Sequence, residues 1–165
     1  MMRTKGFTLV ELMLVVAILG ILGALVLPVY QGHAAEAKVS SAKSNLHAMR
    51  AQIELYKMQH NGTLPGYSNG AAAPVATLVD QFEGTSTLIG QTSPSKQPSD
   101  PFLYGPYLMK IPVNPFNSDN SIAYSTDFAT DADGTSSGWL YNRTTGQIGL
   151  NYPGTDEEGI AYIAY

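Results

Sequence analysis

The chain has 165 residues, no cysteine and a formal net charge of −4 at pH 7. Without cysteine it has no disulfide bond and no thiol chemistry. An acidic chain also lacks the basic surface that non-specific nucleic-acid binding requires, so we expect no nucleic-acid partner. The length allows one small hydrophobic core beside an extended helix.

The first predicted element is an apolar run over residues 7–27, preceded by the cations Arg3 and Lys5 and containing one charge, Glu11. A helix needs about 20 apolar residues to cross a hydrocarbon core of about 30 Å. The next basic residue is Lys38, and such a charge bias keeps the N-terminus in the cytoplasm. The run therefore predicts a single-pass membrane helix with the rest of the chain outside the cytoplasm.

An ordinary secretory signal peptide is the alternative interpretation, with a small-residue cleavage site near Ala34 and Ala35. The apolar core of such a signal usually has about 7–15 residues and no acid. Here it spans residues 7–27 and contains Glu11. The secretory pattern therefore fits poorly.

Residues Lys5–Leu12 read Lys-Gly-Phe-Thr-Leu-Val-Glu-Leu. This motif resembles the N-terminal signal of type IV pilins and type II secretion pseudopilins. The resemblance implies that a prepilin peptidase cuts after Gly6 and methylates the new N-terminus at Phe7. Glu11 then becomes the fifth mature residue. Pro28 becomes the twenty-second, where these families commonly hold a proline.

Glu11 is the costly residue of this segment, because a charge at the bilayer centre costs about 2.5–3.5 kcal/mol on insertion scales. The resemblance implies that Glu11 pairs with the Phe7 amine of a neighbouring subunit during assembly, and opposite charges attract strongly in a low-dielectric medium. The alternative is that Glu11 only extends to the lipid headgroups.

Two glycines and a proline, Gly20, Gly23 and Pro28, interrupt the apolar helix. In a helix interior, glycine costs about 1 kcal/mol and proline about 3 kcal/mol relative to alanine. Lipid and neighbouring helices hold such a helix together in a membrane. In a packed filament we expect a helix break here, as the resemblance also implies. Ordinary glycine enrichment of membrane helices is the alternative.

From residue 29 to residue 62 the pattern is that of an amphipathic helix. The apolar residues are spaced alternately four and three apart, which places them on one face: Ala35, Val39, Ala42, Leu46, Met49, Ile53 and Tyr56. Asn61 and Gly62, with Pro65 beyond, predict the helix end. We expect the apolar face to pack on a sheet formed by later residues.

The remainder is predicted to be a compact head. Prolines concentrated between Pro65 and Pro115 indicate loops, with one short helix near residues 75–82. Strand signals come late, at residues 121–125, 138–141, 147–150 and 160–165. The predicted fold class is α+β, with a long N-terminal helix packed on a small antiparallel sheet. The predicted divisions are a leader (1–6), a transmembrane and assembly helix (7–28), the amphipathic half of the same helix (29–62) and the head (63–165).

The head narrows the resemblance to the major, or G-type, pseudopilin of type II secretion. The likeness is carried by Leu55–Lys57, Asn61–Gly62, Gly105–Pro112 and Asn114–Phe116. That family usually has tryptophan where this chain has Phe116. Residues 66–104 and 152–165 match nothing in the family pattern.

Two further patterns indicate no chemistry. Residues 66–70 match the G-x-S-x-G motif of hydrolases, but that motif needs a strand before it and a helix after it. Here a predicted helix precedes and a loop follows, so we interpret the match as chance. His33, His47 and His60 are too widely spaced for a helical metal pair, and we expect them to be solvated.

An acidic loop is the one candidate metal site. Asp127, Asp131 and Asp133 with Gly134 supply clustered oxygen ligands and a turn, as calcium requires. The resemblance implies the same region, because major pseudopilins hold calcium in a loop between their late strands. The spacing lacks the final glutamate of an EF-hand. A solvated turn remains the alternative.

These observations predict a non-enzymatic filament subunit. The leading hypothesis is a type II secretion pseudopilus subunit, with a type IV pilin for adhesion, motility or DNA uptake as the second. A signal-anchored envelope protein that never polymerises is the third. The resemblance implies as partners prepilin peptidase, the bacterial inner membrane, further copies of the chain, minor pseudopilins and a secretion or pilus assembly platform. After assembly the filament is expected in the periplasm or on the surface.

Overall fold

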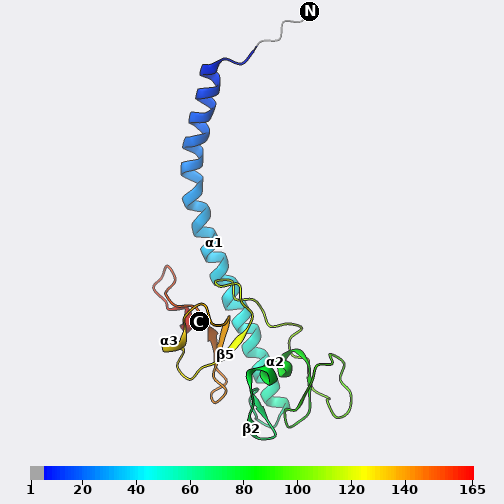
Figure 1. Cartoon of the computed structure of the whole chain (residues 1–165). Coiled ribbons are helices and arrows are strands. Elements are labelled where there is room, and N and C mark those ends of the chain that lie inside the picture. Colours follow the sequence, from blue (N-terminus) through cyan, green and yellow to red (C-terminus); the bar gives the residue numbers. More distant parts are fainter. Residues whose placement is uncertain (1–5) are drawn as a thin grey trace, which may run out of the picture. The chain divides into compact units, whose positions relative to one another are not determined.

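The computed structural model of the chain describes residues 6–165 and, within them, every side chain except those of residues 25–33 (Figure 1). The cations Arg3 and Lys5 of the leader therefore lie outside the described residues. Two compact units are present, divided between Lys38 and Val39. The four predicted divisions (1–6, 7–28, 29–62 and 63–165) stay predictions. The two compact units show where the chain packs on itself and do not test these boundaries.

Helix α1 spans Leu9–Gln59 and is followed by the predicted stop. Asn61 and Gly62 have φ values of 53° and 83°, in the left-handed region where helices commonly end. The Gly62 amide donates to the Lys57 carbonyl oxygen over 2.8 Å. This bond satisfies a carbonyl group that the helix leaves without an amide partner.

One face of α1 forms part of the core of the second unit. The buried residues of this face are those of the predicted apolar stripe from residue 42 onward: Ala42, Leu46, Met49, Ile53 and Tyr56. Val39 is half-buried and Ala35 is exposed. The amphipathic prediction is thus confirmed from the start of the second unit, where there are head residues to pack against (Figure 1).

The elements of the head are short. The helices are α2 (Val75–Glu83), α3 (Phe128–Asp131) and the 3₁₀ helix η1 (Tyr162–Ala164). Two antiparallel pairs are formed by β1 (Tyr67–Ser68) with β2 (Ala71–Ala72), and by β3 (Thr85–Ser86) with β4 (Thr92–Ser93). The third sheet contains β5 (Ile122–Tyr124), β6 (Trp139–Tyr141) and β7 (Ile148–Leu150).

The third sheet places β6 between β5 and β7. β6 pairs antiparallel with β7, as the predicted hairpin requires, whereas β5 pairs parallel with β6. A parallel neighbour needs a crossover, and α3 lies in the connecting segment. Trp139 is fully buried and its indole donates to the Pro112 carbonyl oxygen over 2.8 Å. The indole N–H is thereby satisfied inside the core.

The α+β prediction is confirmed, and α2 and the first three predicted strands lie where expected. The strand predicted over residues 160–165 is wrong. Its end forms η1, with the Tyr162 amide bonded to the Gly154 carbonyl oxygen. The Tyr162 ring packs on Phe116 with centroids 4.5 Å apart. Pairing in this segment is limited to one antiparallel bridge between Thr155 and Ala161, and the segment is also held by this ring contact.

Candidate processing and assembly site

The predicted cleavage junction between Gly6 and Phe7 is exposed. Both residues precede α1, and Phe7 has 77% of its surface exposed. A Cβ built on Gly6 would meet nothing within 4 Å. A protease can therefore reach the peptide bond between them. Cleavage at this bond stays a prediction, since exposure shows only that the bond is accessible.

The first turn of α1 contains a reciprocal pair of hydrogen bonds between Thr8 and Glu11. The Thr8 amide and hydroxyl donate to the Glu11 carboxylate over 2.9 and 2.8 Å. The Glu11 amide donates in return to the Thr8 hydroxyl oxygen over 3.3 Å. This is a capping box, which satisfies amide groups that the start of a helix leaves without partners. The carboxylate also lies at the positive end of the helix dipole.

The capping box gives Glu11 a local partner before any assembly. Its acceptor oxygen is used by Thr8, three residues earlier. The sequence reasoning missed Thr8, although the Thr-x-x-Glu spacing at the start of an apolar helix is the signal for this motif. The predicted pairing of Glu11 with a neighbour's Phe7 amine requires a second subunit and stays a prediction.

The first unit presents apolar side chains to its surroundings. Every described side chain from Phe7 to Ala24 is exposed. Within residues 6–165, no helix is both long enough and apolar enough to cross a membrane. Large exposed apolar surfaces usually indicate interaction sites.

The residues of the predicted helix break lie inside α1, which is continuous in this structure. The helical backbone runs through Gly20, Gly23 and Pro28. A Cβ built on either glycine would meet nothing within 4 Å, so neither glycine is required by a neighbour in this chain. Loosening of the helix in a filament stays a prediction.

In the predicted calcium loop, Asp127 is the N-cap of α3. Its carboxylate accepts from the Ala129 and Thr130 amides and from the Thr130 hydroxyl, at 3.0, 3.4 and 2.8 Å. These bonds lower the pKa of the Asp127 carboxyl, with the Thr130 hydroxyl as the largest cause. Asp131 ends the same helix and is exposed.

Asp133 is held in a different turn. One of its carboxylate oxygens accepts from the Thr135 amide, the Ser136 amide and hydroxyl, and the Asn151 side-chain amide, over 2.8 to 3.0 Å. The pKa of Asp133 is well below its ordinary value, mainly because of the Ser136 and Thr135 amides. Buried Asn151 in turn accepts from the Asp133 and Gly134 amides.

The three aspartates therefore do not converge as a metal site. Asp127 and Asp133 use carboxylate oxygens for their own turns, and in the described part of the chain no group of three His, Asp or Glu side chains is arranged to hold a metal. A bound calcium ion would share these carboxylates with the amide groups that already donate to them. Calcium binding therefore stays a prediction. The three aspartates do not form a preorganised ligand set in this structure.

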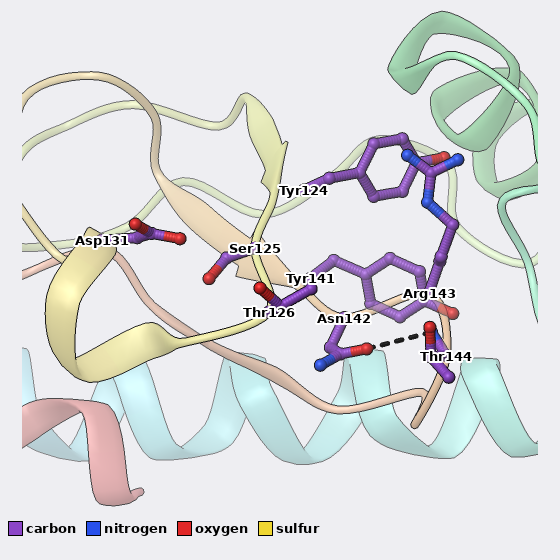
Figure 2. Close-up of a pocket in the computed structure, with 8 residues that line it drawn as sticks. All are labelled: Tyr124, Ser125, Thr126, Asp131, Tyr141, Asn142, Arg143 and Thr144. Carbon is purple, nitrogen blue, oxygen red and sulfur yellow. Dashed lines mark hydrogen bonds between the residues drawn. The ribbon is translucent and has the colours of Figure 1, made fainter.

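A cavity of about 260 Å³ lies beside this loop, between the end of β5 and the β6–β7 turn (Figure 2). The cation in its lining is Arg143, whose guanidinium lies 3.6 Å from the Tyr124 ring centroid and donates to the Ala73 carbonyl oxygen. Figure 2 places Asp131 at the far end of the lining from Arg143. Arg143 is thus committed to structural contacts.

The hydrolase-like motif is a hairpin. Residues 66–70 contain β1 and the turn to β2, and Gly66, Asn69 and Gly70 have positive φ values of 93°, 53° and 75°. The motif needs a strand followed by a helix to expose its serine, whereas here Ser68 lies in β1 and the strand β2 follows. The interpretation as a chance match agrees with this geometry.

One histidine prediction is wrong. His47 is exposed, as expected, and the His33 side chain lies outside the described residues. His60, however, has only 1% of its surface exposed. It follows the last turn of α1 on the side that faces β3, where it bonds to Ser86. Its spacing of four from Tyr56, the last residue of the apolar stripe, was the available signal.

Residues 1–27 match the family described as the prokaryotic N-terminal methylation motif. The type II secretion system core protein G of Pseudomonas aeruginosa is 34% identical over 116 residues, covering 70% of each chain. This chain belongs to the type IV pilin and type II secretion pseudopilin superfamily.

The similarity of this pilin-like protein to G-type pseudopilins is seen in a second species. The core protein G of Klebsiella pneumoniae is 31% identical over 120 residues, covering 72% of this chain and 74% of that protein. A fimbrial protein of Neisseria meningitidis serogroup B is 47% identical over 73 residues, covering 44% of this chain and 41% of that protein. No solved structure matches the chain. The predicted G-type likeness is confirmed, and the protein is a pilin-like filament subunit.

Proposed function

We propose that this protein is a subunit of a type II secretion pseudopilus. In this proposal, prepilin peptidase cuts it between Gly6 and Phe7 and methylates Phe7. The processed chain polymerises through α1 and supports protein export, without enzymatic activity of its own. The observation that carries the proposal is the match to core proteins G over more than two thirds of both chains.

The geometry of the first unit supports the assembly step. An exposed apolar helix with one acid near its start is suited to burial between neighbouring subunits. After cleavage, the new Phe7 amine would lie within the first turn preceding Glu11, and a neighbour's Glu11 would be its partner. An unpaired charge in an apolar medium is costly, so pairing favours the assembled state.

Before assembly the proposed location is the bacterial inner membrane, with the N-terminus in the cytoplasm and the head outside it. The proposed partners are other copies, minor pseudopilins and the assembly platform of the secretion system. Charge bias around residues 7–27 supports this orientation.

A type IV pilin is the second candidate, favoured by the fimbrial match over 73 residues. A non-polymerising envelope anchor is the third. Intact-mass analysis tests processing: we expect loss of residues 1–6 and gain of one methyl group. A mature N-terminus near Glu36 would support a secretory signal peptide instead.

Deletion of the gene distinguishes the first two candidates. We expect secreted proteins to accumulate in the periplasm, and export to return when the chain is supplied again. Loss of surface filaments with normal export would identify a pilin. A chain that is not processed at Gly6 and forms no filament on overexpression would favour the envelope anchor.

A further inference from the structure

A buried aromatic cluster connects the end of α1 to β3. The His60 ring stacks on Tyr56, with ring centroids 3.7 Å apart and planes 3° apart. The Tyr104 and Tyr107 rings pack at centroid distances of 5.0 and 6.2 Å. His60 and Ser86 are both almost completely buried. An imidazole at this place is therefore separated from water by three aromatic rings and the start of β3.

Hydrogen bonds identify the state of the imidazole. The Nδ1 atom lies 2.8 Å from the Tyr56 carbonyl oxygen, and Nε2 lies 3.1 Å from the Ser86 hydroxyl oxygen. A carbonyl oxygen only accepts, so Nδ1 carries the proton and donates. Nε2 is then free to accept from the Ser86 hydroxyl. Neutral His60 thus satisfies both ring nitrogens.

A second proton would disturb this arrangement. It would turn Nε2 into a donor facing a hydroxyl that already donates to it, so the Ser86 hydroxyl would have to rotate inside a closed environment. The new positive charge would also be buried, and an unpaired buried charge is costly. Stacking on Tyr56 recovers part of this cost through a cation–π contact.

No counter-charge faces the imidazole among the contacts of the described residues. The groups that surround it are Tyr56 from α1, Ser86 from β3, the Thr87 backbone just after β3, and Tyr104 and Tyr107 from a later loop. Burial raises the pKa of Tyr56 and Tyr107 far above the ordinary value, so both stay neutral.

Three carboxylates lie on the parts of the flanking helices nearest to His60. Glu54 on α1 lies 3.6 Å from the Lys57 ammonium, Glu83 on α2 accepts from the Ile111 amide over 2.8 Å, and Asp80 on α2 is exposed. The hydrogen bonds of the His60 ring among the described residues go to Tyr56 and Ser86 and not to a carboxylate. Desolvation is accordingly the main cause that lowers the pKa of His60 below its ordinary value.

We propose that His60 is a pH switch that holds the end of α1 on β3 when the imidazole is neutral and weakens this contact when acid protonates it. Because the pKa is lowered in the folded chain, the unfolded chain takes up the proton first as pH falls. The contribution of His60 is complete above the unfolded pKa of about 6.5 and is lost as pH falls from there through the folded pKa.

The test compares full-length chains in detergent, melted at about pH 7.5 and about pH 5.5, on either side of the ordinary histidine pKa of about 6.5. Trp139 is the single tryptophan and is buried, so its fluorescence reports unfolding of the head. We expect wild type to melt several degrees lower at the acidic pH. His60→Gln retains a donor and an acceptor but does not titrate, and we expect it to lose most of this difference.

His47→Gln is the matched control, because His47 is an exposed histidine of the same helix. It should keep the wild-type pH difference. If His60→Gln keeps it as well, the proposal is overturned. Should that variant fail to fold, NMR titration of wild type decides: His60 must titrate at lower pH than His47, and a His60 midpoint at or above that of His47 overturns the proposal.

Discussion

The two units of this chain use apolar residues in opposite ways. In the first unit, the described side chains from Phe7 to Ala24 are exposed, and the one acid is bonded within its own helical turn. In the second unit, the apolar face of α1 is buried against a small sheet. The same helix thus serves two purposes. Substitutions in the first unit should alter assembly, and those in the second should alter stability.

Glu11→Ala gives the largest expected effect. Under the proposed function it removes the partner of a neighbour's Phe7 amine and eases membrane insertion by about 2.5–3.5 kcal/mol. We expect a stable membrane protein that forms almost no filaments, measured by shearing and electron microscopy. Head melting followed by Trp139 fluorescence should be unchanged. A normal filament yield would reduce Glu11 to a residue that only reaches the headgroups.

Leu46→Ala should destabilise the head by about 2–5 kcal/mol, because it removes a fully buried side chain and leaves a cavity. Leu14→Ala is the matched control on the exposed part of α1 and should leave the melting temperature unchanged. Thermal melting of the full chain in detergent measures both. Equal losses in the two variants would contradict the division into an assembly unit and a stability unit.

Asn151→Ala tests the turn that holds Asp133. Asn151 is fully buried and its side chain bonds to both sides of this turn. We expect a loss of about 1–3 kcal/mol, since buried partners would be left unsatisfied. Asn120→Ala removes a single long bond of 3.5 Å and should cost much less. Chemical denaturation measures the free energy of unfolding of both variants. Similar losses in the two would show that the hydrogen bonds of Asn151 do not stabilise the head more than the single bond of Asn120.

Thr8→Val should weaken the start of α1 by about 0.5–2 kcal/mol, the usual cost of losing an N-cap. The head should keep its melting temperature, because the effect is confined to the first turn. Hydrogen exchange of residues 9–12 measures it, with Thr77→Val in the head as the control for the substitution itself. Unchanged exchange at the first turn would show that the capping box contributes nothing there.

Asp133 gives the smallest expected effect, a dependence on acidic pH. Its pKa is lowered in the folded chain, so its contribution is present above the unfolded value of about 3.9 and is lost as pH falls below it. Asp133→Asn removes this titration and should flatten the fall in melting temperature below about pH 4. Asp131→Asn is the control, because Asp131 is exposed on the neighbouring α3. Equal slopes for all three chains would contradict the assignment.

Sequence patterns predicted the structure correctly where the deciding residues are close together in the chain. Spacings of four and three predicted the buried face of α1 from Ala42 to Tyr56, and Asn61–Gly62 predicted its end. The β6–β7 hairpin followed from two short apolar runs around a turn. There the turn residues act locally. The Asn142 side chain accepts from the Thr144 amide (Figure 2) and also from the Thr145 amide.

The failures occur where distant residues decide. His60 looked solvated because the rings of Tyr104 and Tyr107 that cover it are more than forty residues away. Residues 160–165 were predicted to form a strand, but their end forms η1 and the Tyr162 ring packs on Phe116.

By itself, then, the sequence determined the apolar helix, its acid, the processing motif and the α+β class, because each depends on residues within a few turns or on the length of one run. Tertiary structure decided the parallel β5–β6 pairing, the burial of His60 and the contact of Asp133 with Asn151. These outcomes depend on which polar groups and rings meet in space, and satisfaction of buried polar groups is a property of the packed head as a whole.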